Sequence, residues 1–211
     1  MSDTYLTLAG PATGEFKDRG SKFIGFAYSV TTEQEIMEHL ERLRKEHFKA
    51  NHHCFAWRLG REGILFRAND DGEPSGTAGR PILAQIDAAH LTDTFIVVVR
   101  YFGGTLLGAS GLINAYRETA AETLRAATIK EVILYDHFTI HADYAIMPDV
   151  VQGIHKLGIT IQNEQFDDRA HITISIRQRD TEQKLLQLKA QLYKVSVDEA
   201  ETLEWPEGME V

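Results

Sequence analysis

The sequence predicts an α+β protein of two domains, each a β-sheet with helices packed mainly on one face. One observation is an uninterrupted apolar run, Phe95–Val99, which is typical of a central strand covered on at least one face. The other is a change of composition near Thr128–Lys130, after which strand and helix patterns alternate again. We therefore place the domains at residues 1–128 and 129–197, with an acidic tail at 198–211.

The elements of the first domain follow from hydrophobic spacing and helix-end signals. A strand is predicted at Ser21–Val30, and a helix follows because Thr32 and Glu35 form a T-x-x-E capping box. That helix should end near His47. Beyond it we predict a hairpin of strands His53–Leu59 and Ile64–Arg67, a helix from Pro81 to about His90, a strand at Thr94–Tyr101 and a long helix capped by Ser110.

The second domain is predicted to have the order strand, helix, strand, strand, helix, with a short strand closing it. The predicted elements are Val132–Ala142, Ala145–Leu157, Ile159–Gln165, Ala170–Ile176, Asp180–Tyr193 and the closing strand Val195–Val197. This order is the ferredoxin-like arrangement. Residues 198–211 hold six acidic and no basic side chains, so we expect a poorly ordered tail around Trp205.

Composition excludes several functional classes. The chain has 211 residues, is 43% hydrophobic and carries a net charge of −9, with 8 basic against 15 acidic side chains in residues 129–211. The strongly basic footprint of a non-specific duplex binder is therefore missing. No secretory signal or membrane span is apparent, and Cys54 is the single cysteine, so we expect a cytoplasmic monomer without membrane contact.

Two glycine-rich loops give the strongest functional signal. They are DDGEPSGTAGRP at 70–81 and RYFGGTLLGASG at 100–111, and each leads into a predicted helix. Glycine opens backbone N–H groups to a ligand, and a helix N-terminus adds the positive end of a dipole. We therefore predict one anion-binding surface formed by both loops. Its predicted cations are Lys22, Arg67, Arg80, Arg100 and Arg117, and the residues predicted to shape its backbone are Ser75, Thr77, Gly103 and Gly104.

The acidic residues of the first loop have an alternative to binding a ligand. Asp70, Asp71 and Glu73 have the oxygens that Mg²⁺ prefers. Such acids more often cap a turn or form a salt link, here to Arg100 or Arg67. Arg100 is accordingly as compatible with an acidic partner inside the protein as with an external anion.

Other reactive side chains lack the partners that their chemistry needs. His52 and Cys54 share one face of a strand, but no second cysteine and no suitably spaced histidine completes a zinc site. We predict no metal ion and no cofactor. His53 is a candidate for a hydrogen bond to the acidic loop, or for a general base if the protein is an enzyme. Ser110 does not lie in a nucleophile elbow.

Four blocks of the sequence resemble the IMPACT/YigZ family. They are SKF at 21–23, the A-x-H-x-C-x-A run at 50–56, DDGEPSGTAGRPIL at 70–83 and VVVRYFGGTLLG at 97–108. The resemblance covers nearly the whole chain. It departs mildly at Ala109–Gly111, where the family often has Gly-Gly or Ala-Gly.

The resemblance implies a fold and a functional class. The N-terminal domain should be a two-layer α/β sandwich like that of a small-subunit ribosomal protein, also seen in translation factors and GHMP-type kinases. The C-terminal domain should resemble the last domain of elongation factor G. Eukaryotic relatives act in translational control, restraining the amino-acid-starvation kinase by competing for its large co-activator. They do so with an additional N-terminal module, so that interaction is not carried over.

We therefore predict a non-catalytic regulator of translation that binds RNA, the ribosome or a translation component through the anion-binding surface. The alternative is an enzyme acting on a small phosphorylated or nucleotide substrate, which the kinship with GHMP-type kinases favours. Against the enzyme, the glycine-rich loop lacks the serine-rich form that those kinases use, and no catalytic base stands out.

Overall fold

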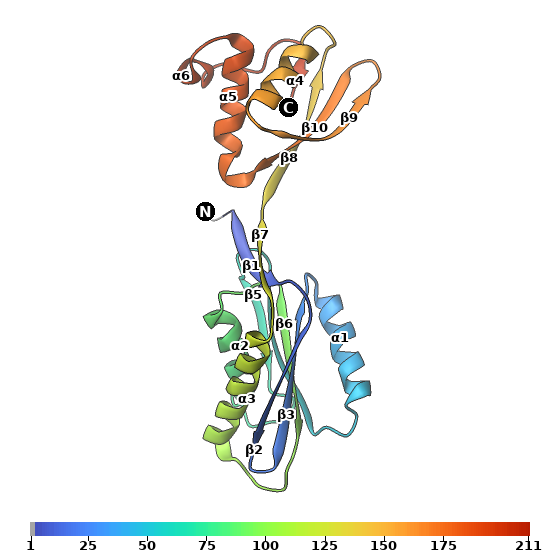
Figure 1. The fold of residues 1–211 in the computed structure, drawn as a ribbon, viewed down its shortest axis with the longest axis vertical. Coiled ribbons are helices and arrows are strands. Elements are labelled where there is room, and N and C mark those ends of the chain that lie inside the picture. The colour runs from blue at the N-terminus through green and yellow to red at the C-terminus, as the bar shows by residue number, and fades with distance from the viewer. Residues whose placement is uncertain (1–2) are drawn as a thin grey trace. The chain divides into compact units, whose positions relative to one another are not determined.

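The structure is a computed structural model and describes residues 3–211 (Figure 1). The chain divides into two compact units, Thr4–Val132 and Ile133–Val211 together with Asp3. We call them the N-terminal and C-terminal domains. Both mix helices with sheets, as the α+β prediction requires. Among residues 3–211, no helix combines the length and apolar character that crossing a membrane requires.

A five-stranded antiparallel sheet forms the N-terminal domain, in the order β2-β3-β6-β4-β5. Its strands are β2 Ala12–Asp18, β3 Ser21–Ser29, β4 His52–Leu59, β5 Leu65–Asn69 and β6 Thr94–Tyr101. The helices are α1 Glu33–Glu46, α2 Gly79–Ala88 and α3 Gly108–Arg125. A separate two-stranded sheet pairs β1 Thr4–Leu8 with β7 Ile129–Ile133. Strands β1 and β2 are additional to the strands predicted from the sequence.

Helices cover both faces of this sheet, which corrects the expected two-layer sandwich (Figure 1). On one face α1 packs on alternate residues of β6, namely Phe95, Val97 and Val99. On the other, α2 and α3 pack on Ile96 and Val98. The apolar run at the centre of β6 is uninterrupted because residues pointing to either face are buried. The domain therefore has three layers, and each face of the sheet has its own core.

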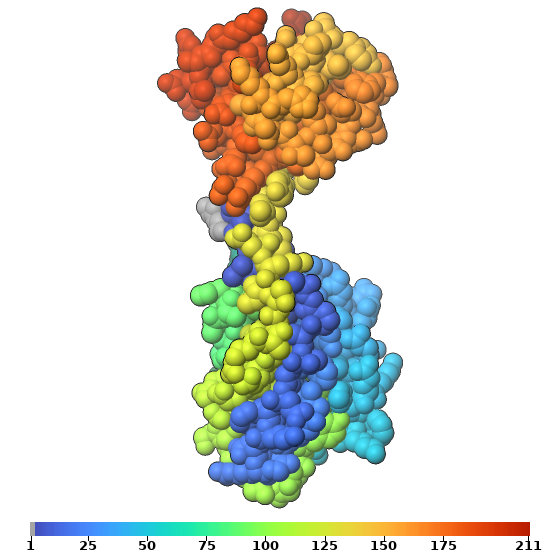
Figure 2. Space-filling view, in the orientation of Figure 1, coloured from blue at the N-terminus to red at the C-terminus, as the bar shows by residue number. Residues whose placement is uncertain are grey.

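Helix α3 lies tightly across strands β2 and β3, as the space-filling view shows (Figure 2). A Cβ atom at Gly25 would lie 2.0 Å from Thr123 Oγ1, and one at Gly14 would lie 2.5 Å from the Thr123 backbone nitrogen. These two glycines allow the close approach. They hold the C-terminal half of α3 against β2 and β3.

The C-terminal domain has a four-stranded antiparallel sheet with the order β11-β8-β10-β9. Its elements are β8 Tyr135–Ala142, α4 Met147–Lys156, β9 Thr160–Phe166, β10 Ala170–Arg177, α5 Thr181–Tyr193, α6 Val197–Ala200 and β11 Met209–Glu210. The core lies between the sheet and helices α4 and α5, and includes Ile140, Ile172 and Leu188. The opposite face of β8 and β10 carries polar residues.

The expected acidic tail is folded, which corrects the sequence analysis. The Ser196 side chain caps α6, Trp205 packs against the core, and Met209 is 5% exposed. The last strand is β11, which pairs with β8. The predicted strand Val195–Val197 is wrong, because the chain turns into α6 there. Acidic composition misled the prediction, since few apolar side chains anchor this segment.

Candidate functional site

The two glycine-rich loops meet at one pocket of about 420 Å³ in the N-terminal domain. The first loop contributes Glu73 and Pro74, and β4 with the residue before it contributes His52 and Asn51. The end of β6, the second loop and the start of α3 complete the wall with Arg100, Phe102, Leu106, Leu107, Gly108, Ala109 and Leu112. We call this cavity the loop pocket. The convergence of the two loops is the arrangement that the sequence predicts.

A buried ion pair lies in the wall of the loop pocket. Arg100 Nη1 donates to Glu73 Oε1 at 2.6 Å, and the two side chains are 6% and 4% exposed. The Tyr116 hydroxyl donates to the same oxygen at 2.7 Å. The predicted salt link between the acidic loop and Arg100 is therefore confirmed. Arg100 joins the two loops, and among residues 3–211 its Nε atom is one of two buried side-chain N or O atoms without a hydrogen-bond partner.

His52 reaches the same ion pair from β4. Its Nδ1 atom lies 2.8 Å from the Asp71 carbonyl oxygen, which can only accept, so Nδ1 carries a proton. Its Nε2 atom lies 3.8 Å from Glu73 Oε1. In the neutral ring this second nitrogen has a free lone pair beside the pocket and can accept a hydrogen bond there.

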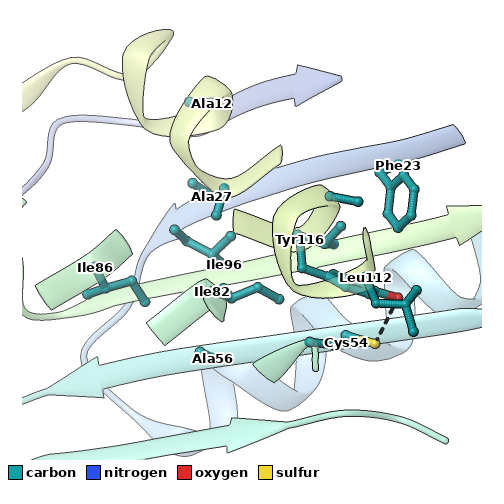
Figure 3. Close-up of a cluster of buried hydrophobic side chains, with 14 of the residues drawn as sticks. Ala12, Phe23, Ala27, Cys54, Ala56, Ile82, Ile86, Ile96, Leu112 and Tyr116 are labelled. Atoms are coloured by element: carbon teal, nitrogen blue, oxygen red, sulfur yellow. Dashed lines mark hydrogen bonds between the residues drawn. The ribbon is translucent and has the colours of Figure 1, made fainter. Parts of the chain in front are cut away.

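The Cys54 thiol lies beneath the pocket and is not a plausible nucleophile. It is fully buried, lies 3.0 Å from the Asp70 carbonyl oxygen and 3.2 Å from the Tyr116 hydroxyl (Figure 3). Burial raises the pKa of the thiol far above its usual value, and burial likewise raises the pKa of Tyr116. Since the thiolate is the reactive form, this cysteine is inert and contributes packing.

The donors at the N-terminus of α2 are already occupied by the chain itself. Asp70 accepts hydrogen bonds from the backbone N–H groups of Gly76, Ala78 and Gly79 at 2.8, 3.0 and 2.8 Å. Burial opposes ionisation of Asp70, but these bonds and Arg80 hold its pKa below the usual value. The expectation that this loop binds phosphate through its N–H groups is corrected, because the Asp70 carboxylate of the same loop already accepts hydrogen bonds from these groups.

The acids of the first loop have separate partners. Asp71 pairs with Arg44 at 3.1 Å and accepts the His53 backbone N–H at 2.7 Å, whereas Glu73 turns to Arg100. The hydrogen bond predicted from His53 to the acidic loop is therefore made by its backbone. Its ring is buried, and burial lowers the pKa of that ring.

The N-terminus of α3, by contrast, has no side-chain cap. Leu107 occupies the N-cap position and makes no side-chain hydrogen bond, and Ser110 lies inside the first turn, so the predicted Ser110 cap is wrong. Gly108 has φ +70°, and a Cβ atom there would meet nothing within 4 Å. Leu107, Gly108 and Ala109 line the loop pocket. An 18-residue helix thus directs its positive end and its unsatisfied N–H groups toward the cavity.

The five predicted cations do not form one surface. Lys22 is opposite Tyr101 and Arg67 is opposite Trp57 in the sheet registers, and both partners belong to the α1 face. Because directly opposed residues share a face, Lys22 and Arg67 lie on that face too. Lys22 is also paired with Glu15 at 2.7 Å. The exposed residues Arg80 and Arg117 are on α2 and α3, on the pocket's face.

The four residues predicted to shape the backbone of the anion-binding surface differ in their surroundings. Gly103 packs against the chain itself, since a Cβ atom there would lie 1.9 Å from the Gly20 carbonyl carbon. Gly104 has φ +86° and open space around it. Thr77 is buried and donates to the Pro74 carbonyl oxygen at 2.6 Å, whereas Ser75 is exposed. Of the nine residues predicted for the site, only Arg100 lines the loop pocket.

Sequence reasoning missed the apolar wall of the pocket and the place of His52. Phe102 and Leu106 are 44% and 82% exposed, which is unusual for large apolar side chains. Their signal is present in the segment 102–107, FGGTLL, where apolar residues lie beside glycines between β6 and α3. His52 was considered only as a metal ligand.

Comparison with known proteins identifies the group to which these loops belong. The Impact N-terminal domain family matches residues 19–124, a range that contains both loops and every residue that lines the pocket. The chain belongs to the IMPACT family. The IMPACT family member YvyE of Bacillus subtilis is 33% identical over 86% of this chain and 83% of its own length. YigZ of Escherichia coli is 35% identical over 67% of this chain and 71% of its own.

A solved structure shares the fold over almost the whole chain. It is described as a hypothetical protein, is 28% identical, covers 92% of this chain and 93% of its own, and superposes with a TM-score of 0.65. The IMPACT family resemblance stated from the sequence is therefore confirmed.

Proposed function

We propose that this protein is a regulator of translation that binds single-stranded RNA of a translation component through the loop pocket. The observation that carries the proposal is the meeting of both glycine-rich loops at a cavity that faces the uncapped N-terminus of α3. Family membership supports the functional class, since eukaryotic relatives act in translational control. The proposal assigns RNA binding to the loop pocket instead of to the anion-binding surface of five cations predicted from the sequence.

The phosphate of a nucleotide is proposed to bind at the start of α3. Free N–H groups of the first helical turn and the helix dipole both favour negative charge. At Gly104 and Gly108 no side chain hinders approach to the backbone. Arg80 and Arg117 are exposed cations on the helices of this face and would contact neighbouring phosphates, Arg117 in exchange for its exposed partner Glu118.

The base is proposed to lie against the apolar wall. Phe102 presents a partly exposed ring, and Leu106 and Leu107 extend the apolar surface into the cavity. Stacking of a base on an aromatic ring contributes about 1–3 kcal/mol and tolerates different bases. Asn51 and His52 add polar groups at the rim that can accept or donate hydrogen bonds.

We extend the proposal to the finer fold assignment. The N-terminal domain would share its ancestry with a ribosomal-protein domain, and the ferredoxin-like C-terminal domain with the last domain of elongation factor G. In the C-terminal sheet the strands lie in the order β11-β8-β10-β9, and along the chain α4 follows β8 and α5 follows β10. This arrangement supports the second assignment. Both structural relationships favour a function on the ribosome, in the cytoplasm.

The salt dependence of RNA binding tests this function. One phosphate at α3 and one each at Arg80 and Arg117 make three contacts, so the slope of log affinity against log salt should be near −2 for single-stranded RNA. Fluorescence anisotropy between 50 and 200 mM salt measures it. The absence of saturable binding at 50 mM salt would refute the proposal. A slope near −3.5 would indicate five phosphate contacts, as expected if all five predicted cations bind the RNA.

An enzyme remains the second candidate, and one observation favours it. His52 is held by the Asp71 carbonyl so that Nε2 faces the Glu73 carboxylate beside the pocket, which suits a general base. A small phosphorylated or nucleotide substrate would then bind saturably with little salt response. Turnover lost in His52→Gln, with binding retained, would establish this alternative.

A further inference from the structure

The outer face of the C-terminal sheet brings together two histidines that are 30 residues apart in the sequence. His141 on β8 and His171 on β10 are directly opposed in the antiparallel register. Their Nδ1 atoms lie 2.6 Å apart, and the two rings are nearly perpendicular, at 80°. Both side chains are only partly buried, so the pair is accessible from solvent.

A carboxylate fixes the outer nitrogen of one ring. His171 Nε2 lies 2.8 Å from Asp167 Oδ1. The same carboxylate oxygen accepts the Arg169 backbone N–H at 3.1 Å, so its position is set by the turn. An ionised carboxylate only accepts, so His171 Nε2 carries the proton and Nδ1 has a free lone pair. A carboxylate that orients a histidine in this way is the usual outer partner of a metal-bound imidazole.

The charges around the pair favour a cation. Asp167 and Asp168 each offer a carboxylate oxygen within 4.8 Å of a His171 ring nitrogen. The nearby cation Arg169 is already paired with Asp143 at 2.8 Å and Glu210 at 3.3 Å. Glu210 is opposite His141 in the register of β11 and β8, so it lies beside the pair on the sheet. Imidazole nitrogens select zinc, copper or nickel over magnesium and calcium.

We propose that His141 and His171 bind one divalent transition-metal ion through their Nδ1 atoms, with Asp167 orienting the ring of His171. Tetrahedral zinc with bonds near 2.0–2.1 Å separates two nitrogen ligands by about 3.3 Å, so the rings need to part only slightly. His141 then carries its proton on Nε2. Water fills the remaining positions, which leaves an open site typical of weak or exchangeable binding. This site lies in the C-terminal domain and is independent of the loop pocket.

Titration of the full chain with Zn²⁺ against a competing indicator tests the proposal. We expect one ion per chain, with affinity reduced at least tenfold in His141→Gln and in His171→Gln, and about tenfold in Asp167→Asn. The matched control is His137→Gln, on the same face of β8, which should bind within twofold of the wild type.

A second measurement separates loss of the site from loss of folding. Zn²⁺ should raise the melting temperature of the wild type and of His137→Gln, but not that of the two site variants, whose circular dichroism should be unchanged. Absence of Zn²⁺ binding by the wild type overturns the proposal. So does equal loss in the His137→Gln control, or full affinity in His141→Gln and His171→Gln.

Discussion

Arg100 and Glu73 form a buried ion pair that ties the two glycine-rich loops together, with Nη1 and Oε1 2.6 Å apart and both side chains at least 94% buried. The pair comes from a central strand and from a loop that has no regular structure of its own. Because Tyr116 of α3 donates to the same Glu73 oxygen, three elements meet at one carboxylate. The shape of the loop pocket depends on this meeting.

Removing one partner of this pair should destabilise the protein strongly. Glu73→Ala leaves the Arg100 charge buried without a counter-charge, so we expect the free energy of unfolding to fall by about 3–5 kcal/mol. Urea denaturation followed by circular dichroism measures the change. The control is Asp87→Ala, which breaks the more exposed pair of Arg58 and Asp87 and should cost no more than about 1 kcal/mol. Equal effects in both variants would contradict the role assigned to Glu73.

Close packing of α3 on the sheet makes a second prediction. Gly25→Ala places a Cβ atom 2.0 Å from Thr123 Oγ1, so the free energy of unfolding should fall by about 1–3 kcal/mol. Gly10→Ala is the matched control, since its Cβ atom would meet nothing within 4 Å. A thermal melt of both variants checks this, and an unchanged Gly25→Ala protein would show that α3 is not held so tightly.

Alkaline unfolding follows from the raised pKa values of Cys54 and Tyr116. Both groups ionise more readily in the unfolded chain, near pH 9 and 10, so their contribution to stability is complete below those values and is lost as pH rises. Each group should lower the free energy of unfolding by about 1.4 kcal/mol per pH unit. In Cys54→Ala the free energy of unfolding should begin its steep decline near pH 10, instead of near pH 9 as in the wild type. Identical pH profiles would refute burial of the thiol as the cause.

Local signals in the sequence predicted much of the fold. Strand Thr94–Tyr101 agrees with β6, and Thr32 caps α1 as the capping box requires, with its side chain accepting the Glu35 N–H. The second layer of helices was missed because an apolar run such as Phe95–Val99 fits one covered face or two. Strand β11 was missed because two residues in an acidic segment carry no periodic signal.

The site was harder to predict because its partners are set by tertiary structure. The Arg100–Glu73 salt link was one of two interpretations, and only the fold decides between them. Asp70 closes on three N–H groups that lie six to nine residues ahead, so the loop that resembled an anion site contains its own anion. His141 and His171 are brought together by strand register, which no local spacing indicates.

The fourth prediction concerns Phe102 in the apolar wall of the pocket. Phe102→Ala removes the stacking surface, so the affinity for single-stranded RNA should fall roughly 5- to 150-fold, the equivalent of about 1–3 kcal/mol. Phe48→Ala is the control, because this ring is 74% exposed and lies just beyond α1, outside the pocket. Anisotropy titrations at one salt concentration compare the two. Equal loss in both variants would indicate unspecific contact with exposed aromatic rings.

The most direct test of the pocket is to map RNA binding by nuclear magnetic resonance on the isotopically labelled full chain. Titration with a short single-stranded oligonucleotide should shift, saturably, the amide signals of residues 102–112, the largest shifts falling on the first turn of α3. Signals on the opposite face of the sheet, in α1, should stay in place. Shifts confined to other parts of the chain, or none at RNA concentrations that saturate the anisotropy signal, would contradict the account.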